Sequence, residues 1–286
     1  MKQALFSTAS GGRAAVSGLP TLTAILFAAF SALIPAASVA EDATTAGEYD
    51  NKVAVITGSS HGLGHELAML GASKGMKLVL VDIRPEGSEI LAKQIREDGG
   101  QAIVYEADLA SAEQRPGVIA AAMSEYGRID YLFNNAGYSY LATHEQMDLE
   151  QAHQLFEVNY WAYADLAQRA IPIMRKQGGG TIVNVSSILG MRAAPPALGH
   201  YAATKHALHG LFQTSAQELK KDNIKVFLAA PGGMKTLISQ HSVGPMADPK
   251  SDRAASWEDP AIVAKDIFEA MQGDEVIFNP GYEGRQ

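Results

Sequence analysis

Tyr201 and Lys205 are the residues of this chain whose types and spacing best suit acid–base chemistry. They stand four positions apart in the stretch YAATK, so on a helix their side chains would project from the same face. A phenol with its ordinary pKa near 10 is a poor base at neutral pH, but a neighbouring ammonium favours the phenolate and lowers that pKa. Taken alone, the pair is more typical of an amphipathic helix with a solvated lysine. The pair indicates catalysis only if a site that binds a cofactor or substrate lies beside it.

A glycine-rich turn at 57–64 predicts such a site. The sequence TGSSHGLG follows the apolar run 53–56 and leads directly into a helical pattern. Glycines permit a tight turn, a close backbone approach to a pyrophosphate and close packing of a helix on a strand. The N-terminus of the helix adds N–H groups and the positive end of its dipole. The spacing G-x-x-x-G-x-G between a strand and a helix therefore predicts a turn that binds a dinucleotide.

Asp82 ends the second apolar run, 18 residues after Gly64. A carboxylate at this place accepts hydrogen bonds from the ribose hydroxyls of an adenosine, and its charge repels a 2′-phosphate. Asp82 therefore predicts NAD rather than NADP as the cofactor. Two alternatives stay open: Asp82 only caps the next turn, or Arg84, two residues later, weakens the discrimination.

The elements that would position these residues alternate between short β-rich runs and longer helical patterns. Strands are expected near 53–56, 77–82, 102–107, 129–134, 181–185 and 224–229. Helices are expected near 63–74, 88–98, 111–126, 148–177, 201–219 and 260–271. Such alternation predicts an α/β fold in a single domain, with a doubly wound parallel sheet (a Rossmann fold) and helices on both faces. Ligands of these sheets bind at the carboxyl ends of the strands.

Composition narrows the classes of function. The 286 residues include 31 acidic and 23 basic side chains, a net charge of −8, which argues against a nucleic-acid partner. The absence of cysteine excludes disulfides, zinc–thiolate sites, iron–sulfur clusters and a thiolate nucleophile. The histidine pairs His61/His65 and His206/His209 lack the arrangement H-E-x-x-H, so no metal site is predicted.

The segment 1–40 has the pattern of a secretory signal peptide. Two basic residues precede the apolar run 21–34, and small residues follow at 36–40, with cleavage expected after Ala40. The apolar run is shorter than the about 20 residues that span a bilayer. We therefore expect an exported protein, periplasmic or secreted, whose mature domain is 41–286. A retained N-terminal membrane anchor and a cytoplasmic protein are the alternatives.

Several motifs then follow one another along the chain. They are TGSSHGLG at 57–64, Asp108-Leu109, Asn134-Asn135-Ala136-Gly137, IVNVSS at 182–187, Tyr201 with Lys205, and Pro231-Gly232 followed by Thr236. In this combination and order the chain resembles the short-chain dehydrogenase/reductase family over essentially all of 51–271. The resemblance implies an NAD(P)-dependent oxidoreductase that acts on the CH–OH group of an alcohol or on a ketone.

The resemblance also implies roles for individual residues. Tyr201 would be the catalytic acid/base, and Lys205, Ser187 and Asn159 would complete a tetrad. Ser187 would hold the substrate oxygen, and Asn159 would support a proton relay through water. Ser187 and Tyr201 lie 14 positions apart, one more than the family pattern, so Ser186 stays as an alternative serine.

For the cofactor, the resemblance implies contacts from the glycine turn and from the ends of the strands. Asp108 would contact the adenine, and segment 231–236 would reach the nicotinamide carboxamide and the phosphates. The expected cofactor-binding residues are Gly58, Ser60, Gly62, Leu63, Gly64, Asp82, Asp108, Leu109, Asn135, Ala136, Gly137, Tyr201, Lys205, Pro231, Gly232 and Thr236.

Apolar side chains on the loops near the predicted site indicate the substrate. They are Tyr138, Tyr140, Leu189, Met191, Leu198, Met234, Leu237 and Ile238. A cleft that they lined would suit a hydrophobic alcohol or ketone, although core packing explains several of them equally well. By resemblance, 237–258 would be a substrate lid, and the helices near 148–177 and 201–219 would form the surfaces of a homodimer or homotetramer.

Together these features predict an NAD-dependent oxidoreductase that interconverts a secondary alcohol and a ketone. Tyr201 would handle the proton and the cofactor would carry the hydride. Two alternatives remain: a carbonyl reductase that prefers NADP, and a cofactor-binding protein without turnover. A membrane partner is expected only if the N-terminal segment is retained.

Overall fold

The computed structural model describes residues 47–251 and 257–281, which belong to one compact unit, Thr45–Gln286. The predicted signal peptide, 1–40, lies outside the described residues, so its cleavage stays a prediction. Within the described part of the chain, no helix is both long enough and apolar enough to cross a membrane.

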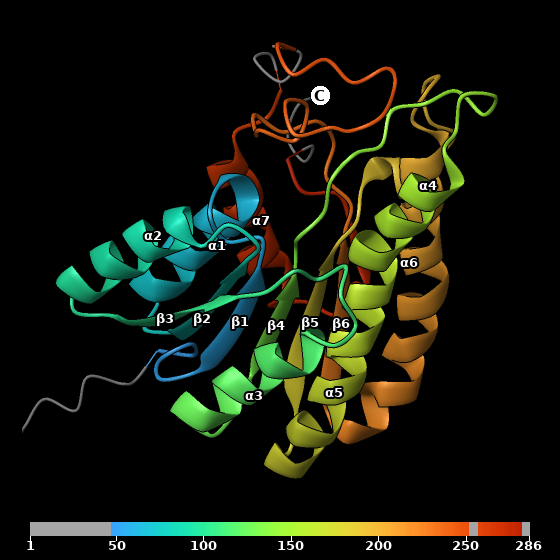
Figure 1. The fold of residues 1–286 in the computed structure, drawn as a ribbon. Coiled ribbons are helices and arrows are strands. Elements are labelled where there is room, and N and C mark those ends of the chain that lie inside the picture. Colours follow the sequence, from blue (N-terminus) through green and yellow to red (C-terminus); the bar gives the residue numbers. More distant parts are fainter. Residues whose placement is uncertain (1–46, 252–256, 282–286) are drawn as a thin grey trace, which may run out of the picture. The chain divides into compact units, whose positions relative to one another are not determined.

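A parallel sheet of seven strands forms the centre of the fold, in the order β3-β2-β1-β4-β5-β6-β7 (Figure 1). The strands are β1 (Val53–Thr57), β2 (Lys77–Asp82), β3 (Gln101–Glu106), β4 (Tyr131–Asn134), β5 (Gly180–Val185), β6 (Ile224–Ala229) and β7 (Ile277–Phe278). All neighbouring pairs are parallel, so each connection must cross over the sheet. The predicted doubly wound sheet is confirmed.

The central strand β1 explains where a ligand can bind. All five of its residues are buried, as expected for a continuous apolar strand covered on both faces. It pairs with β2 on one side and with β4 on the other. The chain therefore leaves β1 in one direction, through β2 and β3, and returns to β4 on the opposite side. At such a reversal the carboxyl ends of the strands leave a crevice.

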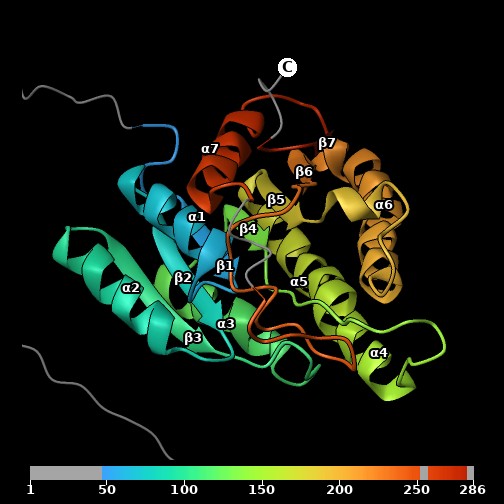
Figure 2. The same cartoon turned by 90° about the horizontal axis from the view of Figure 1, so that it is seen from above.

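Helices cover both faces of the sheet (Figure 2). The first face carries α1 (Gly62–Ser73), α2 (Glu86–Glu97) and α7 (Pro260–Ala270). The second face carries α3 (Arg115–Tyr126), α5 (Ala162–Gln177) and α6 (Gly199–Leu219), with α4 (Leu149–Phe156) leading into α5. Successive residues of a strand point to opposite faces, so Ile56 packs in the first core and Val55 in the second.

The single helix predicted over 148–177 is interrupted in the structure. α4 ends at Phe156, Glu157–Trp161 forms a π-helical turn, η1, and α5 begins at Ala162. Apolar periodicity does not reveal such a turn, because the helix continues on both sides of it. π-Helical turns are frequent at functional sites, and this one contains Asn159.

Two smaller differences also have local causes. The helix predicted from 111 begins at Arg115, where Pro116 suits the first helical turn. The sequence prediction omitted β7, whose two residues are too few to show a period. Two short 3₁₀ turns, η2 (Ile188–Gly190) and η3 (Lys220–Asp222), complete the described helices.

Candidate active site

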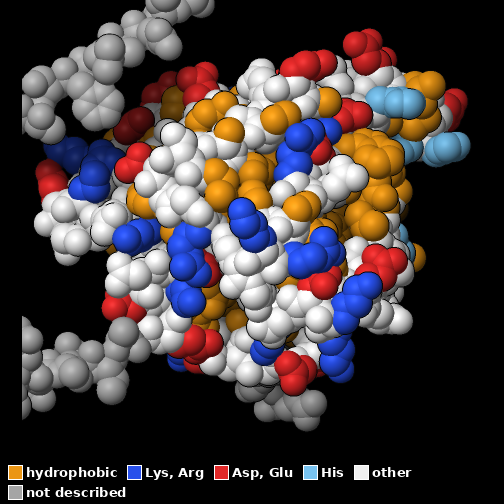
Figure 3. Space-filling model, turned by 90° about the horizontal axis from the view of Figure 1, so that it is seen from below, with side chains coloured by type: hydrophobic (Ala, Val, Ile, Leu, Met, Phe, Trp, Pro, Cys, Tyr) orange, Lys and Arg blue, Asp and Glu red, His pale blue; other side chains and the backbone are white. Residues whose placement is uncertain are grey.

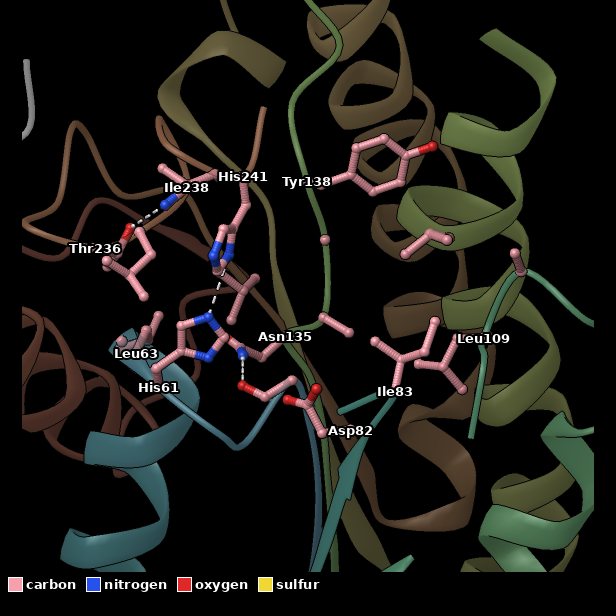
Figure 4. A pocket seen from close by; sticks show the side chains of 18 of the residues that line it. His61, Leu63, Asp82, Ile83, Leu109, Asn135, Tyr138, Thr236, Ile238 and His241 are labelled. Carbon is pink, nitrogen blue, oxygen red and sulfur yellow. Dashed lines mark hydrogen bonds between the residues drawn. The ribbon is translucent and has the colours of Figure 1, made fainter. Parts of the chain in front are cut away.

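A cavity of about 900 Å³ opens at the carboxyl ends of the central strands. We call it the groove. It is lined by twelve of the expected cofactor-binding residues: Gly58, Gly62, Leu63, Asp82, Asp108, Leu109, Asn135, Ala136, Gly137, Tyr201, Lys205 and Thr236 (Figure 4). Four other expected residues, Ser60, Gly64, Pro231 and Gly232, do not line it.

The glycine turn has the geometry that an anion requires. Gly58 adopts a left-handed φ of +68°, which favours glycine. A Cβ atom on Gly64 would collide with the carbonyl oxygen of Gly58, so Gly64 acts by packing rather than by lining the groove. The side chain of His61, the N-cap residue of α1, makes no capping hydrogen bond. The first N–H groups of the helix therefore remain available to a phosphate.

Thr57 and Asn135 fix the turn to the end of β4. The Thr57 hydroxyl oxygen accepts the backbone N–H groups of Asn135 at 2.9 Å and Ala136 at 3.0 Å. The Asn135 side-chain amide donates to the carbonyl oxygens of Thr57 at 2.9 Å and Gly58 at 3.1 Å. Because these donors and acceptors are paired, the turn keeps its shape without a ligand. The Asn135 side chain thus shapes the turn.

The Asp82 carboxylate is buried and held by two backbone donors. Its Oδ2 accepts the N–H of Ser60 at 3.0 Å, and its Oδ1 accepts the N–H of Arg84 at 3.0 Å. Asp82 therefore does cap the next turn. The capping leaves lone pairs on both oxygens, so the same carboxylate can also accept from ribose hydroxyls. Ser60 contributes by orienting Asp82.

Helix α6 brings Tyr201 and Lys205 to the groove on one face. Lys205 is buried, and its Nζ donates to the carbonyl oxygen of Val185 at 2.8 Å. The Nζ atom lies 5.7 Å from the centre of the Tyr201 ring and 5.3 Å from the centre of the Tyr163 ring. The Tyr163 hydroxyl donates to the same Val185 carbonyl at 3.3 Å. The end of β5 thus fixes the position of the lysine.

Burial shifts both groups of this pair toward their neutral forms. It lowers the pKa of Lys205 to about 7. It also raises the pKa of Tyr201 to about 12, although a hydrogen bond with Ser187 opposes the rise. We predicted a lowered pKa for Tyr201 from the neighbouring ammonium together with a positive nicotinamide ring, whereas the protein alone has a raised pKa at this residue. Desolvation of the phenolate outweighs the effect of a lysine that is itself only partly charged near neutral pH.

The two candidate serines have different hydrogen-bond partners, and Ser186 lines the groove whereas Ser187 does not. The Ser187 hydroxyl bonds with Tyr201, as noted, and accepts the N–H of Leu189 at 3.1 Å. The Ser186 hydroxyl instead faces the carbonyl oxygen of Lys205 at 3.5 Å. Ser187 is therefore the serine beside the phenol. The turn η2 and the loop before α6 accommodate the extra residue between Ser187 and Tyr201.

Asn159 is fully buried in the π-helical turn and links three segments. Its amide nitrogen donates to the Tyr138 carbonyl at 3.0 Å and to the Thr204 hydroxyl at 3.3 Å, and its Oδ1 accepts the Tyr138 N–H at 3.2 Å. A Cβ on Gly137 would lie 3.1 Å from Asn159 Oδ1 and 3.8 Å from Lys205 Nζ. The asparagine oxygen and the lysine thus converge beneath Gly137, without Asn159 lining the groove.

The apolar residues expected in a substrate cleft divide between two surroundings. Met234, Leu237 and Ile238 line the groove. Tyr138 also lines it, and burial and the charge of Asp108 raise the pKa of its phenol (Figure 4). The other four do not line the groove: Tyr140, which is fully buried, Leu189, Met191 and Leu198. Tyr140 packs with α4, so core packing explains it, and the other three lie on the loop before α6 or in η2.

Comparison with known proteins identifies the family. The family model described as short chain dehydrogenase matches residues 52–245. The chain belongs to the short-chain dehydrogenase/reductase family. It is 30% identical over 214 residues to cyclohexanol dehydrogenase of Acinetobacter sp., covering 71% of this chain and 85% of that one. The resemblance inferred from the motifs is confirmed.

Two solved members of the family hold nicotinamide cofactors. The structure of a Burkholderia phymatum short-chain dehydrogenase/reductase in complex with NAD has a TM-score of 0.75 and 28% identity, covering 81% of this chain and 89% of that one. That of a metagenomic short-chain oxidoreductase in complex with NADP has a TM-score of 0.68 and 25% identity, with coverage of 81% and 99%. The predicted Rossmann fold and oxidoreductase class are thus confirmed, whereas NAD and NADP both remain open.

The residues that line the groove provide the groups that would bind a nicotinamide dinucleotide. It has N–H groups at the start of α1 for a pyrophosphate, the Asp82 carboxylate for a ribose, and Asp108 with Leu109 for an adenine. Asp108 is held in place, since its Oδ1 accepts the N–H of Ala110 at 2.9 Å.

Sequence reasoning missed further lining residues. They are His61, Ile83, Arg84, Gln151, Gln154, Val158, His241 and Val243, among others. Ile83 and Arg84 directly follow Asp82, and His61 lies inside the glycine motif, so their positions could have identified them. His241 and Val243 come from a segment with no regular pattern, and only the fold brings them to the groove.

Proposed function

We propose that this protein transfers hydride between NAD(H) and a secondary alcohol or ketone, with Tyr201 exchanging the proton. The strongest support is that two groups of residues, one suited to binding a dinucleotide and one suited to proton transfer, lie at the same groove. One is the glycine turn with Asp82. The other is the Tyr201 phenol, bonded to Ser187 and lying above the buried Lys205.

The side chains of the site provide for the proton and for the position of the substrate. A bound nicotinamide supplies or accepts the hydride. Ser187 and Tyr201 hold the substrate oxygen by hydrogen bonds, and this fixes the reacting carbon against the cofactor side of the groove. With its pKa raised to about 12, Tyr201 is protonated at neutral pH and carries the proton that ketone reduction requires.

Alcohol oxidation requires Tyr201 to take up the proton instead. The phenolate of Tyr201 forms more readily when a positive charge lies beside it, because a charge of opposite sign lowers the pKa of the phenol. Lys205 supplies part of this charge, since its pKa of about 7 leaves it partly protonated at neutral pH. Asn159 would support the onward transfer of the proton by holding water near the lysine.

Asp82 supports NAD as the cofactor, because its buried carboxylate repels a 2′-phosphate. An NADP-preferring carbonyl reductase is the second candidate, and Arg84 favours it. The guanidinium of Arg84 reaches the groove, where its Nη2 lies 3.4 Å from His241. Steady-state rates with both cofactors separate the two. A higher kcat/KM with NADP would contradict the proposal for NAD.

A hydrophobic substrate is supported by Met234, Leu237 and Ile238 in the lining of the groove. One relative, cyclohexanol dehydrogenase, is by its name an enzyme that acts on a cyclic secondary alcohol. The test is a screen of NADH absorbance with steroid, aliphatic, sugar and aromatic alcohols and with the matching ketones. Tight NADH binding without turnover on any of them would instead indicate a cofactor-binding protein.

We also propose that the protein forms a homodimer or homotetramer through the α4–α6 side. Leu149 is 61% exposed and Trp161 is 50% exposed, a high exposure for large apolar side chains. Hydrophobic side chains gather toward this side of the molecule in the view from below (Figure 3). Light scattering of the wild-type protein and of Trp161→Glu tests this, with a lower mass expected for the variant.

Export is proposed from the segment 1–40 alone, with a retained anchor as the alternative. The intact mass of the mature protein decides between them. A mass corresponding to 41–286 supports cleavage after Ala40, and the mass of the full chain contradicts it.

A further inference from the structure

The segment 234–243, which we call the strap, crosses the groove and contacts its far walls. Near its start, the Thr236 methyl group packs on the glycine turn, only 3.0 Å from where a Cβ of Gly62 would lie. At its end, the N–H of Val243 donates to the carbonyl of Ser139 at 2.9 Å, and the N–H of Leu141 donates to that of Val243 at 2.8 Å. The strap is thus tied to the loop after β4.

Between these two contacts, His241 joins the strap to the cofactor side of the groove. Its Nδ1 lies 3.3 Å from Nε2 of His61 and 3.4 Å from Nη2 of Arg84. The two imidazole rings meet edge to face, with centres 5.1 Å apart. Figure 4 shows the two histidines pointing toward one another across the groove. His61 belongs to the glycine turn, and Arg84 follows Asp82.

The donors and acceptors of this cluster are fixed by Arg84. A guanidinium only donates, so Nδ1 of His241 is the acceptor, and its single in-plane lone pair is shared between the two donors. His241 is therefore neutral, with its hydrogen on Nε2, and His61 donates through its own Nε2. Protonation of His241 would remove the acceptor and place a cation beside the guanidinium.

The charged and titratable groups that face His241 favour this neutral state. Burial, Arg84 and His61 lower the pKa of His241 below its ordinary value of 6.5, and Asp82 alone opposes them. His241 therefore keeps its contacts with His61 and Arg84 at any pH above the ordinary histidine pKa. It loses them as the pH falls through its own, lowered pKa.

We propose that His241 is a latch that fastens the strap over the groove and sets the rate at which the nicotinamide dinucleotide enters and leaves. The proposal rests on the proposed function, since it takes the groove to be the cofactor site. The latch joins the strap to the two segments expected to hold the pyrophosphate and the ribose. With the strap also tied at Val243, a dinucleotide beneath it leaves only after the His241 contacts break.

The release rate of NADH tests the latch directly. We would load the protein with NADH, displace it with excess NAD⁺, and follow the fluorescence by stopped flow. His241→Phe keeps an aromatic ring beside His61 but has no acceptor. We expect NADH release about tenfold faster than in the wild type, the effect of losing one net hydrogen bond. His153→Ala, on the exposed face of α4, serves as the matched control and should release NADH at the wild-type rate.

A second measurement avoids the cofactor. Amide hydrogen exchange of the cofactor-free protein should be faster at 237–243 in His241→Phe than in the wild type, with exchange in β1 and α6 unchanged. Acid should have the same effect on the wild type. Release of NADH from the wild type should accelerate as the pH falls below 6.5 and through the lowered pKa of His241, whereas release from His241→Phe should change much less.

The outcomes separate the latch from the proposed function. Equal release rates, or the same pH response, in the wild type and His241→Phe would overturn the latch and leave the oxidoreductase proposal intact. A wild-type protein that binds neither NADH nor NADPH would overturn the proposed function, and the latch would fall with it.

Discussion

The two walls of the groove are built in different ways. In the wall formed by the ends of β1, β2 and β4, buried Thr57 and Asp82 are paired with half-buried neighbours, Thr57 with Asn135 and Asp82 with Ser60. The strap opposite is made of half-buried and exposed residues, and it contacts this wall through the Thr236 methyl group and His241. The first wall is part of the folded core, whereas we expect the strap to detach without unfolding the sheet.

This difference predicts what substitutions on each wall will change. Changes in the β1–β2–β4 wall should affect stability and cofactor binding together, because the same buried contacts support both. Changes in the strap should affect cofactor binding and leave the free energy of unfolding almost unaltered. The catalytic groups stand between the two walls, and their substitution should have a larger effect than a change in either wall.

Tyr201→Phe should have the largest effect. The substitution keeps the ring and removes the hydroxyl that bonds with Ser187. Loss of a general acid/base lowers turnover by about 10²–10⁴-fold, so kcat should fall by that factor while the Kd for NADH stays within about twofold of the wild type. Steady-state kinetics and fluorescence titration measure the two. Full activity of the variant would show that Tyr201 is not the acid/base.

Much of the first wall could be predicted from the sequence. Its residues lie in continuous apolar strands and in a glycine turn, where local pattern and conformation agree, so β1, Asp82 and the order of the motifs along the chain sufficed. The direction of the pKa shift of Tyr201 could not be predicted. It depends on how deeply α6 buries the phenol and Lys205 together, and that is a property of the packing.

Gly64→Ala tests the first wall where space is smallest. The added methyl group would collide with the carbonyl oxygen of Gly58, so the turn must shift. Overpacking of this kind costs about 1–3 kcal/mol, and we expect a lower melting temperature together with a large loss of NADH affinity. Calorimetry and fluorescence titration measure the two effects.

Gly210→Ala is the matched control for Gly64→Ala. Gly210 lies on the exposed face of α6, and a Cβ there meets nothing within 4 Å. Alanine should therefore stabilise the protein by about 0.5–1 kcal/mol through its higher helix propensity, with NADH affinity unchanged. A Gly64→Ala protein that melts and binds like the wild type would contradict the geometry of the turn.

Lys205→Met tests the burial of the lysine through the pH dependence of stability. The pKa of Lys205 falls from its ordinary 10.5 to about 7 in the folded protein. Between these values the unfolded state binds more protons, so Lys205 makes the free energy of unfolding rise with pH from about 7 toward 10. Methionine removes this contribution. Urea titrations at pH 7 and pH 9 should therefore show the wild type gaining stability relative to the variant. A constant difference between the two proteins would contradict the lowered pKa.

For the strap, the sequence placed Met234, Thr236, Leu237 and Ile238 near the site, but the contacts of His241 could not be predicted. The sequence indicated a lid over 237–258 only through the family resemblance, and it assigned no role to His241. The reason is physical: His61, Arg84 and His241 come from three separate segments, and each is an ordinary surface residue in its own surroundings. Their meeting depends on how the chain returns from β6 across the sheet, which no local pattern records.

The sharpest comparison comes from making the same substitution, Thr→Val, once in each wall. Of the two variants, Thr236→Val has the smaller expected effect on stability. Thr→Val keeps the shape and removes the hydroxyl. Thr57→Val leaves two N–H groups, of Asn135 and Ala136, without their acceptor, which costs about 1–3 kcal/mol of stability.

Thr236→Val loses only a hydroxyl that accepts the N–H of Ile238 at 3.4 Å, so stability should change by less than about 0.5 kcal/mol. Its NADH affinity should fall a few-fold, because Thr236 lines the groove. Urea unfolding and NADH titration of both variants test the pair. Equal losses of stability would mean that the strap is as much a part of the folded core as the wall it faces.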